Sequence, residues 1–327
     1  MNRVRYLEIM GRAAGKKILV VGDLMLDEFL WGKVSRISPE APVPVVQVTG
    51  ESCYPGGAAN VARNLREFTL HVSVMGITGD DEHGRRLLGL LSECGIDVVL
   101  VERAPGRPTT RKTRVIARQQ QMVRVDREQV GPLEGDAQQR FLQKLDVAVQ
   151  ESDAVIVADY GKGVVAQVVA DELCRLAREH ERILTVDPNP TNPLKWAGVT
   201  AIKPNRLEAF QAAGRHSDSD GDARAVRETG EFLLGHWNAS MLVLTLGEQG
   251  MLLFQAGAEP YPTPARAKEI FDVSGAGDTA IALLTLALAA GASPEEATEI
   301  ANRASGVVVG KLGTATVTEA ELADCFD

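Results

Sequence analysis

The chain has 327 residues, a formal net charge of −9 and 45% hydrophobic residues. This length is sufficient for one large core, and the acidic balance argues against nucleic acid as a partner, because phosphate backbones are bound by basic surfaces. The four cysteines are scattered without a Cys-x-x-Cys pair, and no apolar run reaches the length of a membrane span. We therefore expect a cytoplasmic protein with reduced cysteines and no membrane partner.

The first part of the chain combines predicted strands and helices with extended segments of a different kind. An apolar run at residues 17–22 is typical of a buried parallel strand. Residues 24–48 are rich in proline and β-branched side chains, which favours edge strands or an extended loop. The pattern then predicts a helix from Gly56-Gly57 to about Phe68, a strand at 72–76, a helix at 81–94, a strand at 96–101 and two β segments within 109–126.

From residue 134 onward, helices and strands alternate regularly. This alternation indicates βαβ units, which build a mostly parallel central sheet with helices on both faces. The β-rich inserts at about 29–50 and 109–126 do not fit it, and we expect them to form a small β-sheet lid over the strand ends. The prediction is a single α/β domain over residues 1–327. Its later strands are predicted at 154–158, 183–187, 199–202 and 241–246, with helices beginning near 134, 165, 205 and 222.

Polar residues follow several of the predicted strands at the points where the strands end. In an open α/β sheet, ligands collect at the carboxyl ends of the strands. Turn chemistry could explain any one of these clusters, but four clusters at one sheet edge predict a binding site. The clusters are Asp23 with Asp27, Asp187-Pro188-Asn189, Lys203-Pro204-Asn205 with Glu208, and Thr245-Leu246-Gly247 with Gly250.

The stretch from Asp272 to Thr279 has the sequence Asp-Val-Ser-Gly-Ala-Gly-Asp-Thr and precedes an apolar helical run. A glycine-rich turn that opens a helix leaves backbone N–H groups free at the positive end of the helix dipole, which favours an anion such as phosphate. Asp278 is out of place beside an anion unless it acts as a base during phosphoryl transfer. A dinucleotide-binding fingerprint and a plain helix N-terminus are the alternatives.

The same stretch resembles the C-terminal signature of the ribokinase-like (PfkB) family of carbohydrate kinases, and Pro55–Asn60 resembles its N-terminal signature. The resemblance extends over nearly the whole chain and implies a three-layer ribokinase-like fold, with ATP and Mg²⁺ as cofactors. It implies Asp278 as the catalytic base and Gly275, Ala276 and Gly277 as the anion hole. Sugar contacts would come from Asp27, Gly56, Gly57 and Asn60. Nucleotide contacts would come from Asn205, Arg206, Leu207, Glu208, Thr245, Gly247 and Asn302, with Glu208 holding Mg²⁺ through water.

A narrower resemblance is carried by residues 35–46 and by the basic segment from Lys112 to Asp126. These are similar to the kinase domain of heptose 7-phosphate kinases, which implies phosphorylation of the anomeric hydroxyl of D-glycero-D-manno-heptose 7-phosphate for ADP-heptose and lipopolysaccharide synthesis. None of the histidines lies in the His-x-Gly-His motif of an adenylyltransferase, so a single-function kinase is expected. Another sugar or nucleoside kinase, or a non-catalytic sugar-phosphate sensor, remains an alternative.

The basic segment also suggests where a sugar phosphate would bind. Alternate residues of a strand share a face, so Lys112, Arg114 and Arg124 are expected on one side of the lid and Arg111 on the other. Arginine suits phosphate because its planar group donates two hydrogen bonds at once, although a solvated sheet face is the alternative. Open lid edges also favour pairing with a second subunit, so a homodimer through the lid is expected.

Overall fold

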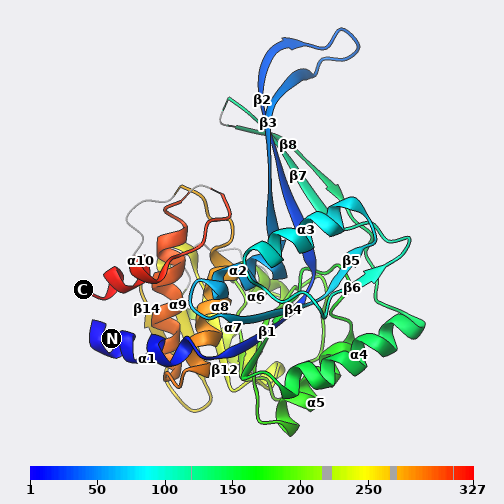
Figure 1. Cartoon of the computed structure of the whole chain (residues 1–327). Helices are drawn as coiled ribbons and strands as arrows, with labels where there is room; N and C mark the ends of the chain where they lie inside the picture. Colours follow the sequence, from blue (N-terminus) through cyan, green and yellow to red (C-terminus); the bar gives the residue numbers. More distant parts are fainter. Residues whose placement is uncertain (119, 216–222, 266–270, 312) are drawn as a thin grey trace.

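The computed structural model describes residues 1–118, 120–215, 223–265, 271–311 and 313–327 (Figure 1). The expected helix start at residue 222 lies outside the described residues. The helices are α1 (Arg3–Ala13), α2 (Ala58–Arg66), α3 (Glu82–Glu93), α4 (Gly135–Gln150), α5 (Gln167–Glu179), α6 (Arg206–Ala212), α7 (Ala223–His236), α8 (Ala276–Ala289), α9 (Pro294–Val308) and α10 (Glu319–Ala323). The strands are β1 (Lys17–Gly22), β2 (Leu24–Ile37), β3 (Pro44–Gly57), β4 (His71–Met75), β5 (Ile77–Gly79), β6 (Glu102–Ala104), β7 (Arg111–Ala117), β8 (Gln120–Arg127), β9 (Ala154–Ala158), β10 (Ile183–Asp187), β11 (Ala201–Ile202), β12 (Met241–Thr245), β13 (Met251–Gln255) and β14 (Tyr261–Thr263).

The central sheet has eight strands in the order β14-β13-β12-β11-β10-β9-β1-β4. The pairs from β12 through to β4 are parallel, whereas β13 and β14 add an antiparallel edge. Helices separate most of the parallel strands along the chain, and the thirteen residues 188–200 connect β10 to β11 without a helix. The predicted mostly parallel sheet is therefore confirmed, and its carboxyl ends meet at one edge.

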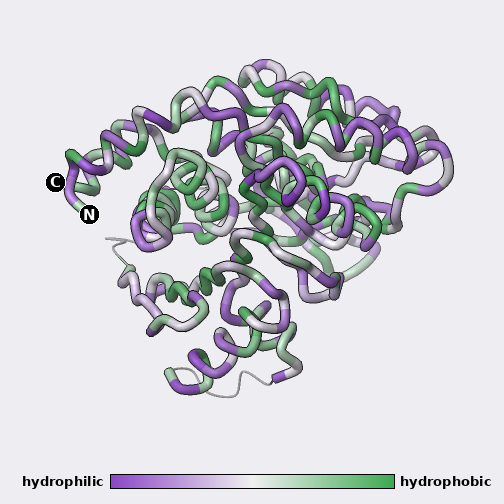
Figure 2. Tube along the Cα trace, turned by 90° about the horizontal axis from the view of Figure 1, so that it is seen from below, coloured by the Kyte–Doolittle hydropathy of each residue, from purple (hydrophilic) through white to green (hydrophobic). Residues whose placement is uncertain are grey.

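Two hydrophobic cores lie on the two faces of this sheet. Along β1, Ile18 and Val20 belong to one core and Leu19 and Val21 to the other, because successive side chains of a strand point to opposite faces. The first core includes residues of α1, α2, α3, α8 and α9, and the second includes residues of α4, α5, α6 and α7. Most helices carry both hydrophobic and hydrophilic residues, as expected for helices that cover a sheet (Figure 2).

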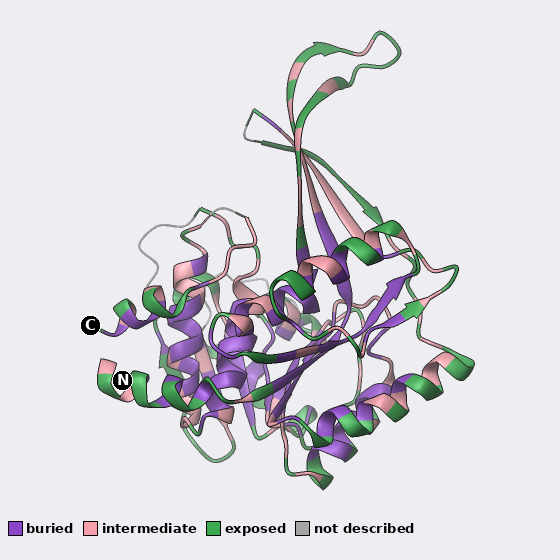
Figure 3. Cartoon of the chain, in the orientation of Figure 1, coloured by how far each residue is buried: buried purple, intermediate pink, exposed green. Residues whose placement is uncertain are grey.

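Helix α8 is the exception, because it is buried almost all round. Its residues from Thr279 to Leu288 are all buried, and it appears as a mostly purple helix inside the molecule (Figure 3). Two threonines satisfy their hydroxyl groups within this apolar surrounding. The Thr285 hydroxyl lies 2.6 Å from that of Thr185 on β10, and the Thr279 hydroxyl donates to Asn64 Oδ1 on α2 at 2.8 Å. The first turn of α8 is thereby fixed between the sheet and α2.

The lid is a four-stranded sheet in the order β3-β2-β7-β8, which projects from the strand ends of the central sheet (Figure 1). Strand β2 pairs antiparallel with β3 and parallel with β7. The outer part of the β2–β3 hairpin is exposed, whereas the first residues of β2 are buried (Figure 3). The predicted small β-sheet lid is confirmed.

Two local predictions were wrong. Residues 96–101 do not form a strand, because Asp97 makes only an isolated bridge to Ser73 and its carboxylate accepts a hydrogen bond from the Val99 backbone, which starts a turn. Strand β2 is also central in the lid rather than an edge or a loop. The prolines that argued against a central strand lie at the hairpin end and in the edge strand β3, where a missing N–H is tolerated.

Candidate active site

The glycine-rich turn forms the N-terminus of α8. Gly275 precedes the helix with φ +82°, in the left-handed region that favours glycine, and a Cβ atom there would lie 3.0 Å from Asn60 Nδ2. Among the described residues, no acceptor takes a hydrogen bond from the backbone N–H of Gly277 or Asp278. These donors stand at the positive end of the helix dipole, so the turn has the properties of an anion site.

Asp278 lies in the first turn of α8, and both its carboxylate oxygens accept hydrogen bonds. Asn60 Nδ2 on α2 donates to Oδ2 at 2.7 Å, and the Tyr160 hydroxyl donates to Oδ1. Burial raises the pKa of Asp278 to about 6, while the two donors oppose this rise. A carboxyl with a pKa in this range is ionised at neutral pH and can still accept a proton, as a general base must.

A buried ion pair lies beside this turn. Lys203, which follows β11, is 2% exposed, and its Nζ lies 3.0 Å from the Asp187 carboxylate at the end of β10. The same Nζ lies 3.5 Å from the position that a Cβ on Gly277 would occupy. A fixed ammonium group therefore adjoins the backbone donors of α8. Lys203 and Asp187 both belong to polar clusters that the sequence predicts at the sheet edge.

A large polar cavity opens at the carboxyl ends of β9, β10, β11 and β12, next to α8. It contains the predicted nucleotide-contact residues of the 205–208 segment and the β12 end, which supports the expectation that the clusters converge. Sequence reasoning had omitted Asp159 and Tyr160. The residues lining it include Asp159, Tyr160, Asp187, Lys203, Asn205, Arg206, Leu207, Glu208, Thr245, Gly247, Gly277 and Asp278.

The Asn-x-x-Glu segment has a structural use in addition to any contact with a ligand. The Asn205 side chain accepts a hydrogen bond from the Glu208 backbone, and Glu208 Oε2 accepts one from the Asn205 backbone at 2.7 Å. This reciprocal arrangement is a capping box, which satisfies two N–H groups at the start of α6. The capping box uses Oε2, and no described residue donates a hydrogen bond to Glu208 Oε1, so this oxygen can face the polar cavity.

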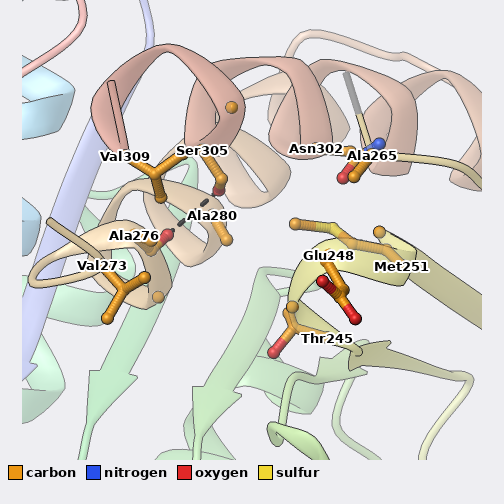
Figure 4. A pocket seen from close by; sticks show the side chains of 14 residues that line it. Thr245, Glu248, Met251, Ala265, Val273, Ala276, Ala280, Asn302, Ser305 and Val309 are labelled. Carbon is orange, nitrogen blue, oxygen red and sulfur yellow. Dashed lines mark hydrogen bonds between the residues drawn. The ribbon is translucent and has the colours of Figure 1, made fainter. Parts of the chain in front are cut away.

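An apolar cleft adjoins the polar cavity and shares Thr245, Gly247, Val273 and Gly277 with it. Its other lining residues include Met251, Ala280 and Val309, which present flat apolar surfaces (Figure 4). Asn302 on α9 also faces the cleft, but its amide nitrogen donates to the Thr263 and Pro264 carbonyls. The cleft has the composition of a small-molecule site with a few polar groups.

The predicted sugar-contact residues lie where the lid meets the central sheet. Asp27 on β2 is 5% exposed, and its Oδ1 accepts a hydrogen bond from Arg114 Nη1 at 2.6 Å. A Cβ on Gly56 would lie 2.3 Å from Asp27 Oδ2, and one on Gly57, which has φ +59°, would lie 2.6 Å from the Asp23 carbonyl. The glycine pair is therefore needed to bring β3 against β2.

The lid register places Lys112, Arg114 and Arg124 on one face, as expected, because Lys112 pairs with Asp27 and Arg124 with Arg114. Arg111 instead contacts Glu28 on the other face. Arg124 makes two hydrogen bonds to Asp126 at 2.8 and 2.9 Å. Arg114 Nη1 donates to the Lys112 carbonyl at 3.4 Å, but among the described residues none forms a hydrogen bond or ion pair with the Lys112 ammonium. Burial, with the nearby positive charges of Arg124 and Lys162, lowers the pKa of Lys112.

The described side chains do not favour direct coordination of a metal ion. Within the described ranges, no group of three or more His, Cys, Asp and Glu side chains could hold a metal ion. A cation at this site would therefore need ligands from a bound phosphate or from water. No helix in the described part of the chain is long and apolar enough to cross a membrane.

Solved structures share the fold of the chain. Ribokinase from Arabidopsis thaliana, complexed with ribose and ATP, superposes with a TM-score of 0.73 and 17% identity over 95% of this chain and 99% of that one. Phosphofructokinase-2 from Escherichia coli superposes with a TM-score of 0.75 and 20% identity over 95% and 98%. The expected ribokinase-like fold is therefore confirmed.

Curated relatives are more similar in sequence. Bifunctional protein HldE of Desulfatibacillum aliphaticivorans is 44% identical over 94% of this chain, and that of Geobacter sulfurreducens is 42% identical over 98%. The matches span 62% and 65% of the length of those relatives. The family model for pfkB carbohydrate kinases matches residues 15–321, and the chain therefore belongs to the pfkB family of ATP-dependent carbohydrate kinases.

Proposed function

We propose that the chain phosphorylates the anomeric hydroxyl of D-glycero-D-manno-heptose 7-phosphate to the β-1,7-bisphosphate, in the ADP-heptose route to lipopolysaccharide. The observation that carries the proposal is one cavity lined by the Asp278 carboxylate and by the N-terminus of α8, at the strand ends from which the lid with its basic face projects (Figure 1). Two similarities support heptose 7-phosphate as the substrate. Residues 35–46 and 112–126 resemble heptose 7-phosphate kinases, and the chain is 44% and 42% identical to two bifunctional HldE proteins.

In this mechanism Asp278 accepts the proton of the anomeric hydroxyl as the hydroxyl oxygen attacks the γ-phosphorus. The bond between that phosphorus and the ADP oxygen breaks, and ADP leaves with the electron pair. In the Gly275–Gly277 turn the Ala276 N–H already donates to the Val273 carbonyl at 3.3 Å. The backbone N–H groups of Gly277 and Asp278 would therefore hold the phosphoryl oxygens, and Lys203 adds a fixed positive charge beside them. Catalysis then rests on positioning and on electrostatic stabilisation, as in phosphoryl transfer generally.

The nucleotide would lie across the two adjoining spaces. Its base fits the apolar cleft beside Met251 and Asn302, and its phosphates extend past Thr245 and Gly247 into the polar cavity. Mg²⁺ retains several waters and binds through one or two carboxylates plus phosphates, which fits a site without a cluster of acidic ligands. Glu208 would hold it through water by the oxygen that the capping box leaves free, and the ion would neutralise phosphate charge.

The sugar would lie between α8 and the lid. Asn60 Oδ1 is buried and has no hydrogen-bond partner among the described residues, so it can accept a hydrogen bond from a sugar hydroxyl while its amide nitrogen holds Asp278. Asp27 supplies a second acceptor, with Gly56 and Gly57 beside it. The 7-phosphate would be bound at the lid by Lys112, supported by Arg114 and Arg124.

Lys112 is the strongest of these three candidates. Arg114 is already bonded to Asp27 and Arg124 to Asp126, so each would need to share or exchange its partner. The Lys112 ammonium is half-buried, and the charges that act on it are the cations Arg124 and Lys162 and the carboxylates Asp27 and Asp126. Arg124 and Lys162 are paired with Asp126 and Glu128, so a phosphate at this face would be bound first by the Lys112 ammonium.

We also propose a homodimer formed through the lid. Strands β3 and β8 are the edges of the lid sheet, and every residue of β8 is exposed. Three of its exposed residues are apolar, Met122 at 41%, Val123 at 50% and Val125 at 48%. Open edges with apolar side chains pair readily with another strand, which would cover them.

The direct test of the proposed function is a panel of sugars, sugar phosphates and nucleosides incubated with Mg-ATP and scored for ADP release. Heptose 7-phosphate should give the highest kcat/KM. A higher value for an unphosphorylated sugar or a nucleoside would assign another substrate within the family. Sugar-phosphate binding without ADP release would identify a sensor.

Asp278→Asn should lower kcat by about 100-fold or more, which is the scale for removing a general base, while Mg-ATP still binds. In the wild type, the rate should fall as the pH drops through about 6, where Asp278 becomes protonated. Steady-state kinetics measures kcat and its dependence on pH, and calorimetric titration measures the binding of Mg-ATP. Near-normal kcat in the variant would place the base elsewhere.

Although Asp278→Asn should lower kcat, it should raise the free energy of unfolding. The folded-state pKa of Asp278 is about 6 and its ordinary value is 3.8, so burial of the charged form costs stability above pH 6 and nothing below about 3.8. Urea denaturation should show Asp278→Asn to be more stable than wild type at pH 8, by up to about 3 kcal/mol, and this advantage should vanish on acidification. Exposed Asp136→Asn is the control; an advantage that does not depend on pH would contradict the prediction.

Lys112→Ala should reduce the preference for heptose 7-phosphate over unphosphorylated heptose by about tenfold or more, the value of one charged hydrogen bond. Exposed Lys33→Ala, in the outer part of the neighbouring lid strand β2, should leave that preference unchanged. The ratio of kcat/KM values for the two sugars measures it. If Lys112→Ala retains the wild-type preference, the phosphate binds elsewhere; if wild type has no preference, the heptose phosphate assignment is wrong.

Sedimentation velocity should find a dimer for the wild type and a monomer for Val123→Asp, because a buried charge opposes strand pairing at this edge. Val130→Asp is a matched control, since Val130 is 61% exposed but lies outside the lid strands. A dimer that persists in Val123→Asp would show that β8 is not the interface.

A further inference from the structure

The segment after β9 reaches the active site through a tightly held loop. It has the sequence Asp159-Tyr160-Gly161-Lys162-Gly163. The carboxylate of Asp23, which is 1% exposed, accepts three backbone hydrogen bonds from this segment, from Tyr160 at 2.9 Å and from Lys162 and Val164 at 3.0 Å. Asp23 therefore lies beneath the loop and fixes its backbone, instead of facing the polar cavity.

This loop directs a single phenol at the carboxylate of Asp278. The Tyr160 hydroxyl donates to Oδ1, and Asn60 Nδ2 donates to Oδ2. The two donors come from different layers of the fold, Tyr160 from a strand end and Asn60 from α2. Together they fix the plane of the carboxylate. Each oxygen retains a second lone pair, with which it can accept the proton of a substrate hydroxyl.

We propose that Tyr160 is a positioning residue for the catalytic base: its hydrogen bond orients the Asp278 carboxylate and favours the ionised form, and Asp23 keeps the Tyr160 loop in place. The proposal rests on the proposed role of Asp278. Tyr160 keeps its own proton throughout, so that the proton of the substrate goes to Asp278 alone.

The charged groups around the two residues favour Tyr160 as the hydrogen-bond donor and Asp278 as the proton acceptor. Burial and the charges of Asp278 and Asp187 raise the pKa of Tyr160 well above its ordinary value, so the phenol remains a donor. The charged side chains that act on Asp278 are Asp187, which raises its pKa, and Lys203, which lowers it. Asp27 also acts on Tyr160. Removing the Tyr160 hydroxyl leaves all of these in place, so its own contribution can be isolated.

Tyr160→Phe is the first test, because it removes only the hydroxyl. The single-turnover rate should be measured against pH in wild type and variant. A hydrogen bond to a charged group has the strength of about one pKa unit or more, so the acid limb of the variant should lie about one pH unit higher. The rate on the plateau should fall by about tenfold, since the carboxylate loses one of its two fixed donors.

Tyr6→Phe is the matched control. Tyr6 is fully buried on α1, and its hydroxyl makes no hydrogen bond within the part of the chain that the structure describes, so the same chemical change should leave the pH profile and the rate unchanged. A packing role for Tyr160 would predict the same for Tyr160→Phe. An acid limb and plateau rate of Tyr160→Phe equal to wild type would overturn the proposal.

A second variant covers the case in which Tyr160→Phe fails to fold. Difluorotyrosine at position 160 keeps the hydroxyl and makes it a stronger donor, so the acid limb should move to lower pH, opposite to Tyr160→Phe. An unmoved limb would count against the proposal. Asp278→Asn tests the role of Asp278 separately from the role of Tyr160. Near-normal turnover in that variant would reject Asp278 as the base, whatever the result for Tyr160→Phe.

Discussion

The proposed active site depends on keeping one partly buried carboxylate, that of Asp278, ionised at the edge of the polar cavity. Burial alone favours the protonated form of Asp278 and raises its pKa to about 6. Two neutral donors, Asn60 and Tyr160, and one cation, Lys203, act in the opposite direction. The N-terminus of α8 adds its own positive end. A base is thereby available at neutral pH next to a cradle for anions, at the cost of some folded stability.

The rest of the fold serves to hold these groups in register. Helix α8 is buried from Thr279 to Leu288, so its first turn cannot shift without disturbing the core. Asn64 on α2 holds Thr279, and Asn60 on the same helix holds Asp278. The ends of β9, β10 and β11 supply Tyr160, Asp187 and Lys203. Because parallel strands end at one edge, residues distant in sequence meet around a single carboxylate.

The layers, the lid and the glycine-rich turn could be predicted from the sequence, because hydrophobic periodicity and turn residues specify them locally. Polar residues after strands also identified Asp187 and Lys203. The same rule applied to β9 would have found Tyr160, although its hydrogen bond to Asp278 spans 118 positions and has no local signal. The pairing of Arg114 with Asp27 was equally unpredictable, since it depends on lid register, whereas Asp126, the partner of Arg124, lies two positions along the same strand. Asn205 and Glu208 form a capping box at the start of α6. The Asn-x-x-Glu motif alone did not distinguish this structural role from ligand binding.

The most direct measurement of the central claim is a carbon NMR titration of the aspartate side-chain carboxyls, with the Asp278 signal assigned by its loss in Asp278→Asn. The account predicts that this carboxyl titrates near pH 6 in the free protein. A midpoint near the ordinary value of 3.8 would mean that the carboxylate is not held in a water-poor site. The electrostatic basis assigned to the catalytic base would then be wrong.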